Sequence, residues 1–339
     1  MDANMASTTR MTNGGSGNLQ MKGTVQTTLS AKREQWLQCI HGDDENSMRR
    51  QIMDLLGDLR AWWTINSARG LTPCDENGEP KAWRLLHGLL NRCFVTKQMV
   101  TVRRLCDGYP FEGNNEVWSL VSVLDDMKKH AHLLTRKAIF DEEQVPYDLE
   151  AIERDVERER LALTSGNGDR NSYCRLTSAV IEQRRAVRRH EELDLLAGVK
   201  NEDRSANDQV RPEFFDAMIL RLRTTCNDIC KKVNKFLAHA ATPEDRPEGV
   251  SSSQTPAALF DAARVIKETF DFASSVILGK GCLSLLASEL VDHLEYIECP
   301  LVRKEDVPKV RRVWDETAQK LSASFGNAEE FIKGLGVSV

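Results

Sequence analysis

Apolar residues recur every three or four positions along most of the chain, which is the spacing of a helix with one buried face. Clusters of Gly, Pro, Asn, Asp and Ser separate these periodic stretches, as in the segment TPCDENGEP between Thr72 and Pro80. No stretch alternates apolar and polar residues in the manner of a strand. The pattern predicts an all-α fold, with helices over residues 31–66 (interrupted at 42–45), 81–107, 117–140, 146–163, 172–196, 212–240, 257–278, 283–297 and 306–323.

The helix predicted from Pro212 to Ala240 has the clearest pattern, because Pro can open a helix and an unbroken apolar seam follows. The seam consists of Ile219, Leu222, Cys226, Ile229, Val233, Phe236 and Ala240. Residues at alternating spacings of three and four share one helix face, so this helix is expected to pack against a core.

A polar stripe with the same spacing runs beside that seam. It consists of Arg221, Thr225, Asp228, Lys232, Lys235 and His239. On a continuous α-helix Lys232 and His239 are two turns apart, roughly 10 Å along the axis. A histidine can act as a general acid or base near neutral pH, and a lysine can neutralise a phosphate. The alternative interpretation is structural, with His239 capping or packing the helix end and the lysines extending along its surface.

Composition changes this picture in three ways. The net charge of −5 indicates no global basic face, so any contact with nucleic acid must be local. The nine cysteines are scattered and odd in number, which favours free thiols in a reducing, cytoplasmic setting. No apolar run approaches the roughly 20 residues that span a bilayer, so we expect no membrane partner.

Other motifs suggest no metal and no cofactor. Cys226 and Cys230 have chelating spacing but lack a second pair, and His130 and His132 would point about 200° apart on a helix. No Gly-rich phosphate loop or nucleophile elbow occurs. The basic run from Arg184 to His190 either steers RNA or, the favoured interpretation, forms a solvated helix face paired with Glu191, Glu192 and Asp194.

Three short blocks resemble the HEPN superfamily of helical domains, in particular the abortive-infection U-type proteins. They are VNKFLAHA (233–240), MVTVRRLCDG (99–108) and VWSLVSVLDDM (117–127). The resemblance covers residues 81–298 and implies a HEPN-like helical bundle, often dimeric. Active members are metal-independent ribonucleases of phage defence or toxin–antitoxin systems. This resemblance implies RNA and a second copy of the chain as partners, and a protein partner is the other expectation.

The family motif is an Arg, then four to six intervening residues, then the catalytic His. Here the His matches His239, and residues 232–234 contain Lys232 but no Arg. The resemblance therefore implies catalytic roles for His239 and Lys232. The substrate-binding residues that it suggests are Lys235, Asn234, Asp228, Arg103 and Arg104. Lys lacks the planar fork with which Arg grips a phosphate, so two hypotheses stay open: a working ribonuclease, or a catalytically inactive helical scaffold that binds protein.

The expected organisation has four parts. Residues 1–30 are polar and aperiodic, as in a disordered leader. An N-terminal helical region follows over 31–80, then the HEPN-like bundle over 81–298 and a C-terminal helical extension over 299–339. The length allows either one domain with additions or two domains.

Overall fold

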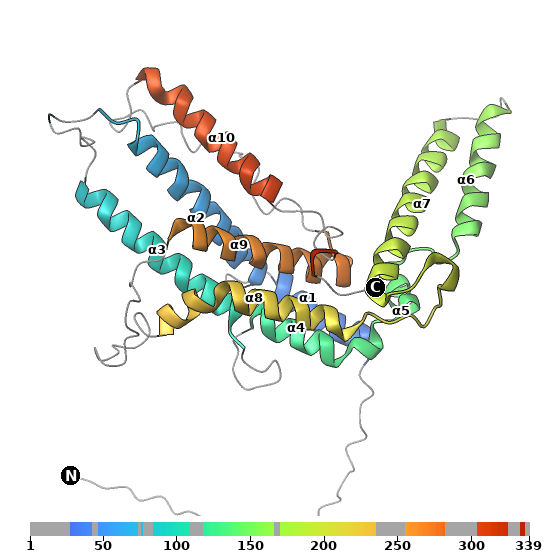
Figure 1. Cartoon of the computed structure of the whole chain (residues 1–339). Coiled ribbons are helices and arrows are strands. Elements are labelled where there is room, and N and C mark those ends of the chain that lie inside the picture. The colour runs from blue at the N-terminus through green and yellow to red at the C-terminus, as the bar shows by residue number, and fades with distance from the viewer. Residues whose placement is uncertain are drawn as a thin grey trace, which may run out of the picture.

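The computed structural model confirms the all-α prediction. It describes residues 28–42, 47–73, 76, 84–108, 118–165, 170–234, 255–281, 304–324 and 333–335. In these ranges every regular element is a helix, and the extended backbone contributes only an isolated bridge between Thr135 and Gln209 (Figure 1). The predicted leader lies almost wholly outside the described residues, and so does the helix predicted over 283–297.

The first two helices are α1 (Leu29–His41) and α2 (Met48–Arg69), so the predicted interruption near Gly42 is confirmed. Each helix begins at a hydroxyl side chain. Thr28 Oγ1 accepts a hydrogen bond from the amide of Ala31, and Ser47 Oγ accepts one from the amide of Arg50. These side chains satisfy backbone donors that the first helical turn leaves unpaired.

The centre of the molecule is α8 (Pro212–Lys232), which packs against α3 (Arg84–Cys106), α4 (Leu120–Lys129) and α9 (Pro256–Asp271). Pro212 opens α8, as predicted, and a π-helical turn, Phe272–Ile277, extends α9. One hydrophobic core joins these helices to α1 and α2. Among the described residues, the N-terminal helices therefore share a core with the predicted bundle.

The single helix predicted over residues 117–140 is wrong. The structure has α4, a 3₁₀ turn at Ala131–Leu133 and then α5 (Arg136–Glu143). The amides of Arg136 and Lys137 donate to the carbonyl oxygens of Asp208 and Ala206, and the amide of Val210 donates to the carbonyl of Leu134. These three hydrogen bonds to residues 206–210 satisfy backbone N–H and C=O groups that a continuous helix would have paired within itself.

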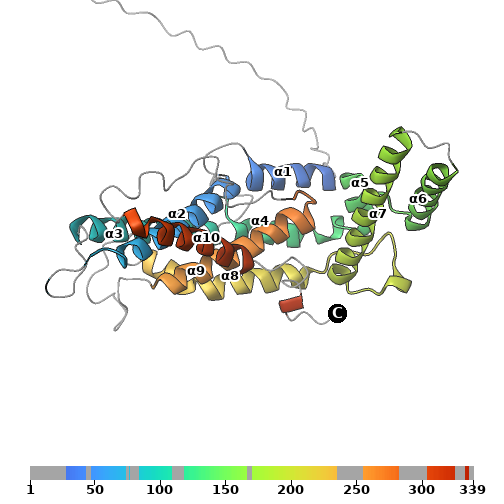
Figure 2. The same ribbon diagram turned by 90° about the horizontal axis from the view of Figure 1, so that it is seen from above.

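Two antiparallel helices form an arm that stands away from one end of the molecule (Figures 1 and 2). They are α6 (Leu149–Thr164) and α7 (Arg170–Ala197), and Arg175 pairs with Glu159 across them at 3.2 Å. Of the described side chains, α6 buries only that of Ile152, and the buried side chains of α7 begin at Ala186. In the outer half of the arm, the side chains between α6 and α7 are therefore only partly shielded from solvent.

The last long helix, α10 (Val307–Ser324), lies along α2, as Figure 1 shows. Val310 packs against Ala68, and the guanidinium of Arg60 lies 4.1 Å from the ring centre of Trp314. Two further 3₁₀ turns cover Asn201–Asp203 and Lys304–Asp306. None of the helices in the described part of the chain is long and apolar enough to cross a membrane.

Candidate functional site

The predicted apolar seam of α8 is buried wherever it is described. Ile219, Leu222, Cys226, Ile229 and Val233 are at most 8% exposed. Phe236 and Ala240, the remaining seam positions, lie outside the described residues. The buried seam anchors the helix, so polar groups on its flanks are held at fixed positions.

The polar stripe lies on the flank of α8 that faces α9. Arg221 Nη2 donates to Glu268 Oε2 of α9 at 2.6 Å, and Glu268 also pairs with Arg264. Lys232 is half-buried further along this flank, whereas Asp228 is exposed and accepts a hydrogen bond from the side-chain amide of Asn227. The stripe thus combines a half-buried anchor at Arg221 with accessible polar groups near the helix end.

The backbone changes its geometry just after Lys232. The α-helix ends there, and Val233 and Asn234 are π-helical. A π turn holds more residues than an α turn, so the α-helical spacing of the stripe is not kept beyond Lys232 at Val233 and Asn234. His239 and Lys235 lie outside the described residues. Asn234 is described and exposed.

Arg103, a residue of α3, lies against the opposite flank of α8. Its Nε lies 3.7 Å from Asp107 Oδ2, and both charges act on Cys230 of α8. Burial first, and then the neighbouring Cys226 and Asp107, raise the pKa of the Cys230 thiol to about 12 despite the opposing charge of Arg103. Because Cys230 and Lys232 are two residues apart, their side chains point about 200° apart. The structure therefore does not bring Arg103 and Lys232 together on one flank.

Arg104 is the next residue along α3 and is exposed. The guanidinium of Arg223, on α8, lies over Gly108, where a Cβ would come within 3.3 Å of Nη2. Arg103 and Arg223 thus place two guanidinium groups near the end of α3. The sequence pattern did not single out Arg223, because its position is neither in the seam nor in the stripe.

Three thiols meet at the contact between α3 and α8. Cys106 is hydrogen-bonded to Cys226, and that contact together with burial raises the pKa of Cys106, with Cys230 adding to the effect. A thiol with a raised pKa stays protonated at neutral pH and is a poor nucleophile and metal ligand. Within the described ranges no three His, Cys, Asp or Glu side chains are arranged to hold a metal ion.

A buried polar cluster links α1 to α4, and the sequence interpretation missed it. Asp126, 1% exposed, accepts hydrogen bonds from Lys32 Nζ at 3.2 Å and from Trp36 Nε1 at 2.8 Å. His130 Nδ1 lies 3.4 Å from Asp126 Oδ1. The signal available in the sequence was one aspartate on the core side of an apolar helix, which gives no indication of its partners.

The expected divergence of His130 and His132 assumed a continuous helix, and that assumption is wrong. His130 ends α4 and His132 lies in the 3₁₀ turn, so the ring centres are 6.1 Å apart. His130 Nδ1 is already within 2.9 Å of the carbonyl oxygen of Asp126.

The basic run of α7 is only partly a solvated face. Arg188 is exposed and pairs with Glu192 at 2.9 Å, as predicted. Arg189 is buried instead, and its Nε donates to Glu143 Oε2 of α5 at 2.9 Å. His190 is also buried, so the predicted interpretation is wrong for these two residues. Arg189 keeps the predicted pairing with Glu192, at 2.9 Å, but Glu143 and Arg136 of α5, which bind Arg189 and His190, lie more than forty positions away along the chain.

His190 belongs to a network at the base of the arm. Arg136, fully buried, pairs with Asp194 at 2.8 Å and with Asp208 at 2.9 Å. Arg204 also donates to Asp194, at 2.6 Å. The network joins α5, α7 and the segment before α8, so it fixes the arm to the body.

Neither the family models, nor the curated proteins, nor the solved structures contain a match to this chain.

Proposed function

We propose that the chain is a HEPN-like protein that cleaves RNA without a metal ion, in phage defence or a toxin–antitoxin system. The observation that carries the proposal is the position of α8. Its buried seam fixes a polar flank that reaches Lys232 directly before the block VNKFLAHA. The C-terminal end of a helix carries partial negative charge, which stabilises a protonated histidine or lysine nearby.

In the proposed reaction, the ribose 2′-oxygen attacks the adjacent phosphorus and the bond from phosphorus to the 5′-oxygen breaks. The 2′-hydroxyl loses a proton and the departing 5′-oxygen gains one, and His239 transfers one of these protons. Lys232 balances the negative charge that builds on the phosphate oxygens. The products are a 2′,3′-cyclic phosphate and a 5′-hydroxyl.

Substrate contacts follow from the two flanks of α8. Asp228 lies near the end of α8, and Asn234 and Lys235 follow that helix in the sequence; these three residues bind the nucleotide being cut. Arg103 lies across the helix from Lys232, and together with Arg104, the next residue of α3, it binds a neighbouring phosphate of the same strand. In keeping with the family resemblance, two copies of the chain meet so that both His239 side chains face one groove.

RNA cleavage in EDTA tests this proposal. Wild type and His239→Ala are incubated with a mixed-sequence RNA, with His132→Ala as the matched control because His132 is exposed and lies far from α8 in sequence. We expect cleavage by wild type and His132→Ala and at least a hundredfold loss in His239→Ala. Equal rates in all three proteins would contradict the assignment of His239.

The arm supports a second candidate function, a helical scaffold that binds protein. Leu161 is 58% exposed, Tyr173 66% and Ile181 61%, and the outer seam of the arm has no buried side chain among those described. A two-helix arm without a third layer leaves apolar surface for a partner helix. A photocrosslinking residue at Ile181, compared with one at Arg188, tests this in cells. One recurrent crosslinked protein at Ile181 alone supports the scaffold, and identical products at both positions argue against it.

A further inference from the structure

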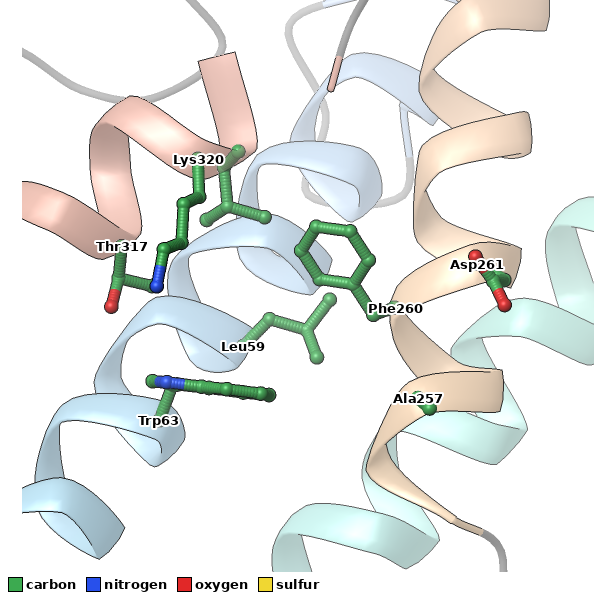
Figure 3. Close-up of a pocket in the computed structure, with 8 residues that line it drawn as sticks. Leu59, Trp63, Ala257, Phe260, Asp261, Thr317 and Lys320 are labelled. Atoms are coloured by element: carbon green, nitrogen blue, oxygen red, sulfur yellow. The ribbon is translucent and has the colours of Figure 1, made fainter. Parts of the chain in front are cut away.

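An apolar pocket lies between α2, α9 and α10, away from the RNA site proposed above. Its volume is about 230 Å³ (Figure 3). The lining residues are Leu59, Trp63, Ala257, Phe260, Asp261, Thr317, Lys320 and Leu321. Both α9 and α10 pack against α2, and the pocket occupies the space that remains between them.

The walls suit a flat apolar molecule. Leu59 and Leu321 are almost fully buried and present aliphatic groups, while the Trp63 ring, 40% exposed, and the half-buried Phe260 ring stand on opposite sides (Figure 3). Aromatic side chains favour stacked or edge-on contacts with another ring. Figure 3 shows the Trp63 ring edge-on and the Phe260 ring face-on, so an aromatic ligand can stack on one ring and meet the other with its edge.

The volume sets the ligand size. An apolar protein cavity of about 150 Å³ accommodates benzene. A pocket of about 230 Å³ therefore has room for a bicyclic ring system such as naphthalene or indole.

The charges at the pocket suggest the polar end of the ligand. Asp261, on α9, lies beyond Phe260 in Figure 3 and is 3.7 Å from the guanidinium of Arg264, which balances its charge. Lys320 is exposed and lies on the α10 wall. The hydroxyl of Thr317 donates to the carbonyl of Val313 at 2.7 Å, so it has no hydrogen left for a ligand carboxylate, and Lys320 is the donor that such a group would meet. A carboxylate at the Lys320 edge matches this arrangement better than an ammonium group.

We propose that this pocket binds a small bicyclic aromatic carboxylate. The ring lies between Trp63 and Phe260, over Leu59, and the carboxylate extends to Lys320. The site does not depend on the proposed ribonuclease activity, because no residue of α8 lines it.

Titration with 2-naphthoate, followed by calorimetry or ligand-observed NMR, tests the proposal on the full-length chain. Ala257→Phe fills the pocket from α9 without removing a core side chain, and Ala323→Phe on α10 is the matched control, because Ala323 is exposed and does not line the pocket. We expect Ala257→Phe to weaken binding at least about tenfold and Ala323→Phe to leave it unchanged. Circular dichroism of both variants verifies folding.

Lys320→Gln tests the charged end. It is expected to weaken 2-naphthoate about fivefold and to leave uncharged 2-naphthylmethanol unaffected. Absence of 2-naphthoate binding to wild type, or unchanged binding to Ala257→Phe, overturns the pocket assignment. Equal affinity of wild type for 2-naphthoate and for 2-naphthylmethylammonium overturns the preference for a carboxylate.

Discussion

Arg136 Nη1 donates a hydrogen bond to His190 Nδ1 at 3.1 Å, and this contact determines which nitrogen of His190 carries the proton. A guanidinium can only donate, so Nδ1 accepts. The hydrogen then lies on Nε2, which donates to the carbonyl oxygen of Tyr147 at 3.0 Å. The ring is neutral in this arrangement and joins the base of α7 to α5 and to the start of α6.

Stability should decrease as the pH falls below about 6.5, the ordinary pKa of a histidine. Burial, and then the charges of Arg136 and Arg204, lower the pKa of His190 against the opposing effects of Tyr147 and Asp194. Burial also lowers the pKa of His41, to about 4. Because the unfolded chain takes up these protons first, acid favours unfolding, and we expect the Tm to fall by several degrees between pH 7 and pH 5. Replacement of His190 by Gln should reduce that dependence, whereas exposed His132→Gln should not. A Tm independent of pH in this range would contradict the neutral assignment.

Arg136→Met should destabilise the fold by about 3 kcal/mol or more, because it leaves the carboxylates of Asp194 and Asp208 partly unpaired in a buried site. Arg188→Met removes one partner of the ion pair between Arg188 and Glu192. The Arg188 side chain is 74% exposed, so the change should lower the free energy of unfolding by less than about 0.5 kcal/mol. Urea unfolding measures both. Equal effects would show that burial of Arg136 has no energetic role.

Two glycines give a matched test of backbone geometry. Gly279 has φ +63°, and a Cβ there would overlap the carboxyl group of Glu143, so Gly279→Ala should destabilise the chain by about 1–3 kcal/mol. Gly57 lies inside α2, and apart from the local backbone of that helix no described atom comes within 4 Å of an added Cβ, so Gly57→Ala should stabilise the chain by about 0.5–1 kcal/mol. Thermal unfolding of the two variants should therefore shift in opposite directions. A stabilising Gly279→Ala would exclude this packing of Glu143.

Asp126→Asn should cost about 3 kcal/mol, because the buried ammonium of Lys32 would face a neutral amide. The control is Asp216→Asn, which removes one partner of the pair with Lys128, where the Asp216 side chain is 56% exposed. That change should cost less than about 0.5 kcal/mol. Comparable losses in the two variants, measured by denaturant unfolding, would mean that the Asp126 cluster is solvated.

Lys232→Arg tests the departure from the family motif. If Lys232 balances phosphate charge, the guanidinium fork should raise the rate of RNA cleavage several-fold, and Lys232→Gln should lower it at least about tenfold. Lys231→Gln is the matched control, because Lys231 is adjacent and exposed. Equal rates for Lys232→Gln and Lys231→Gln would remove Lys232 from the proposed mechanism.

The sequence predicted what local periodicity determines, and it missed what distant contacts determine. The seam of α8 repeats with the helical period, so its burial could be foreseen from Ile219 to Val233. The end of α4 could not be foreseen, because the backbone amides after it bond to the carbonyl oxygens of Ala206 and Asp208, which are distant in the sequence.

Charged side chains were the other source of error. A run of arginines is ordinarily solvated, but Arg189 is buried with two carboxylate partners, Glu192 of α7 and Glu143 of α5, and the second of these is distant in the sequence. The partners Lys32 and Asp126 are 94 positions apart, and no local pattern connects them. The position of Lys232 on the polar flank followed from helical spacing, but the π turn at Val233 and Asn234 did not.

The most direct test of the ribonuclease proposal is the chemistry of the RNA ends produced in EDTA. A labelled RNA is compared with the same strand carrying 2′-deoxy sugars, using wild type and His239→Ala. We predict a 2′,3′-cyclic phosphate and a 5′-hydroxyl from the RNA with wild type, and no cleavage of the deoxy strand or by His239→Ala. An intact RNA with wild type, or the same products from His239→Ala, would contradict the proposal.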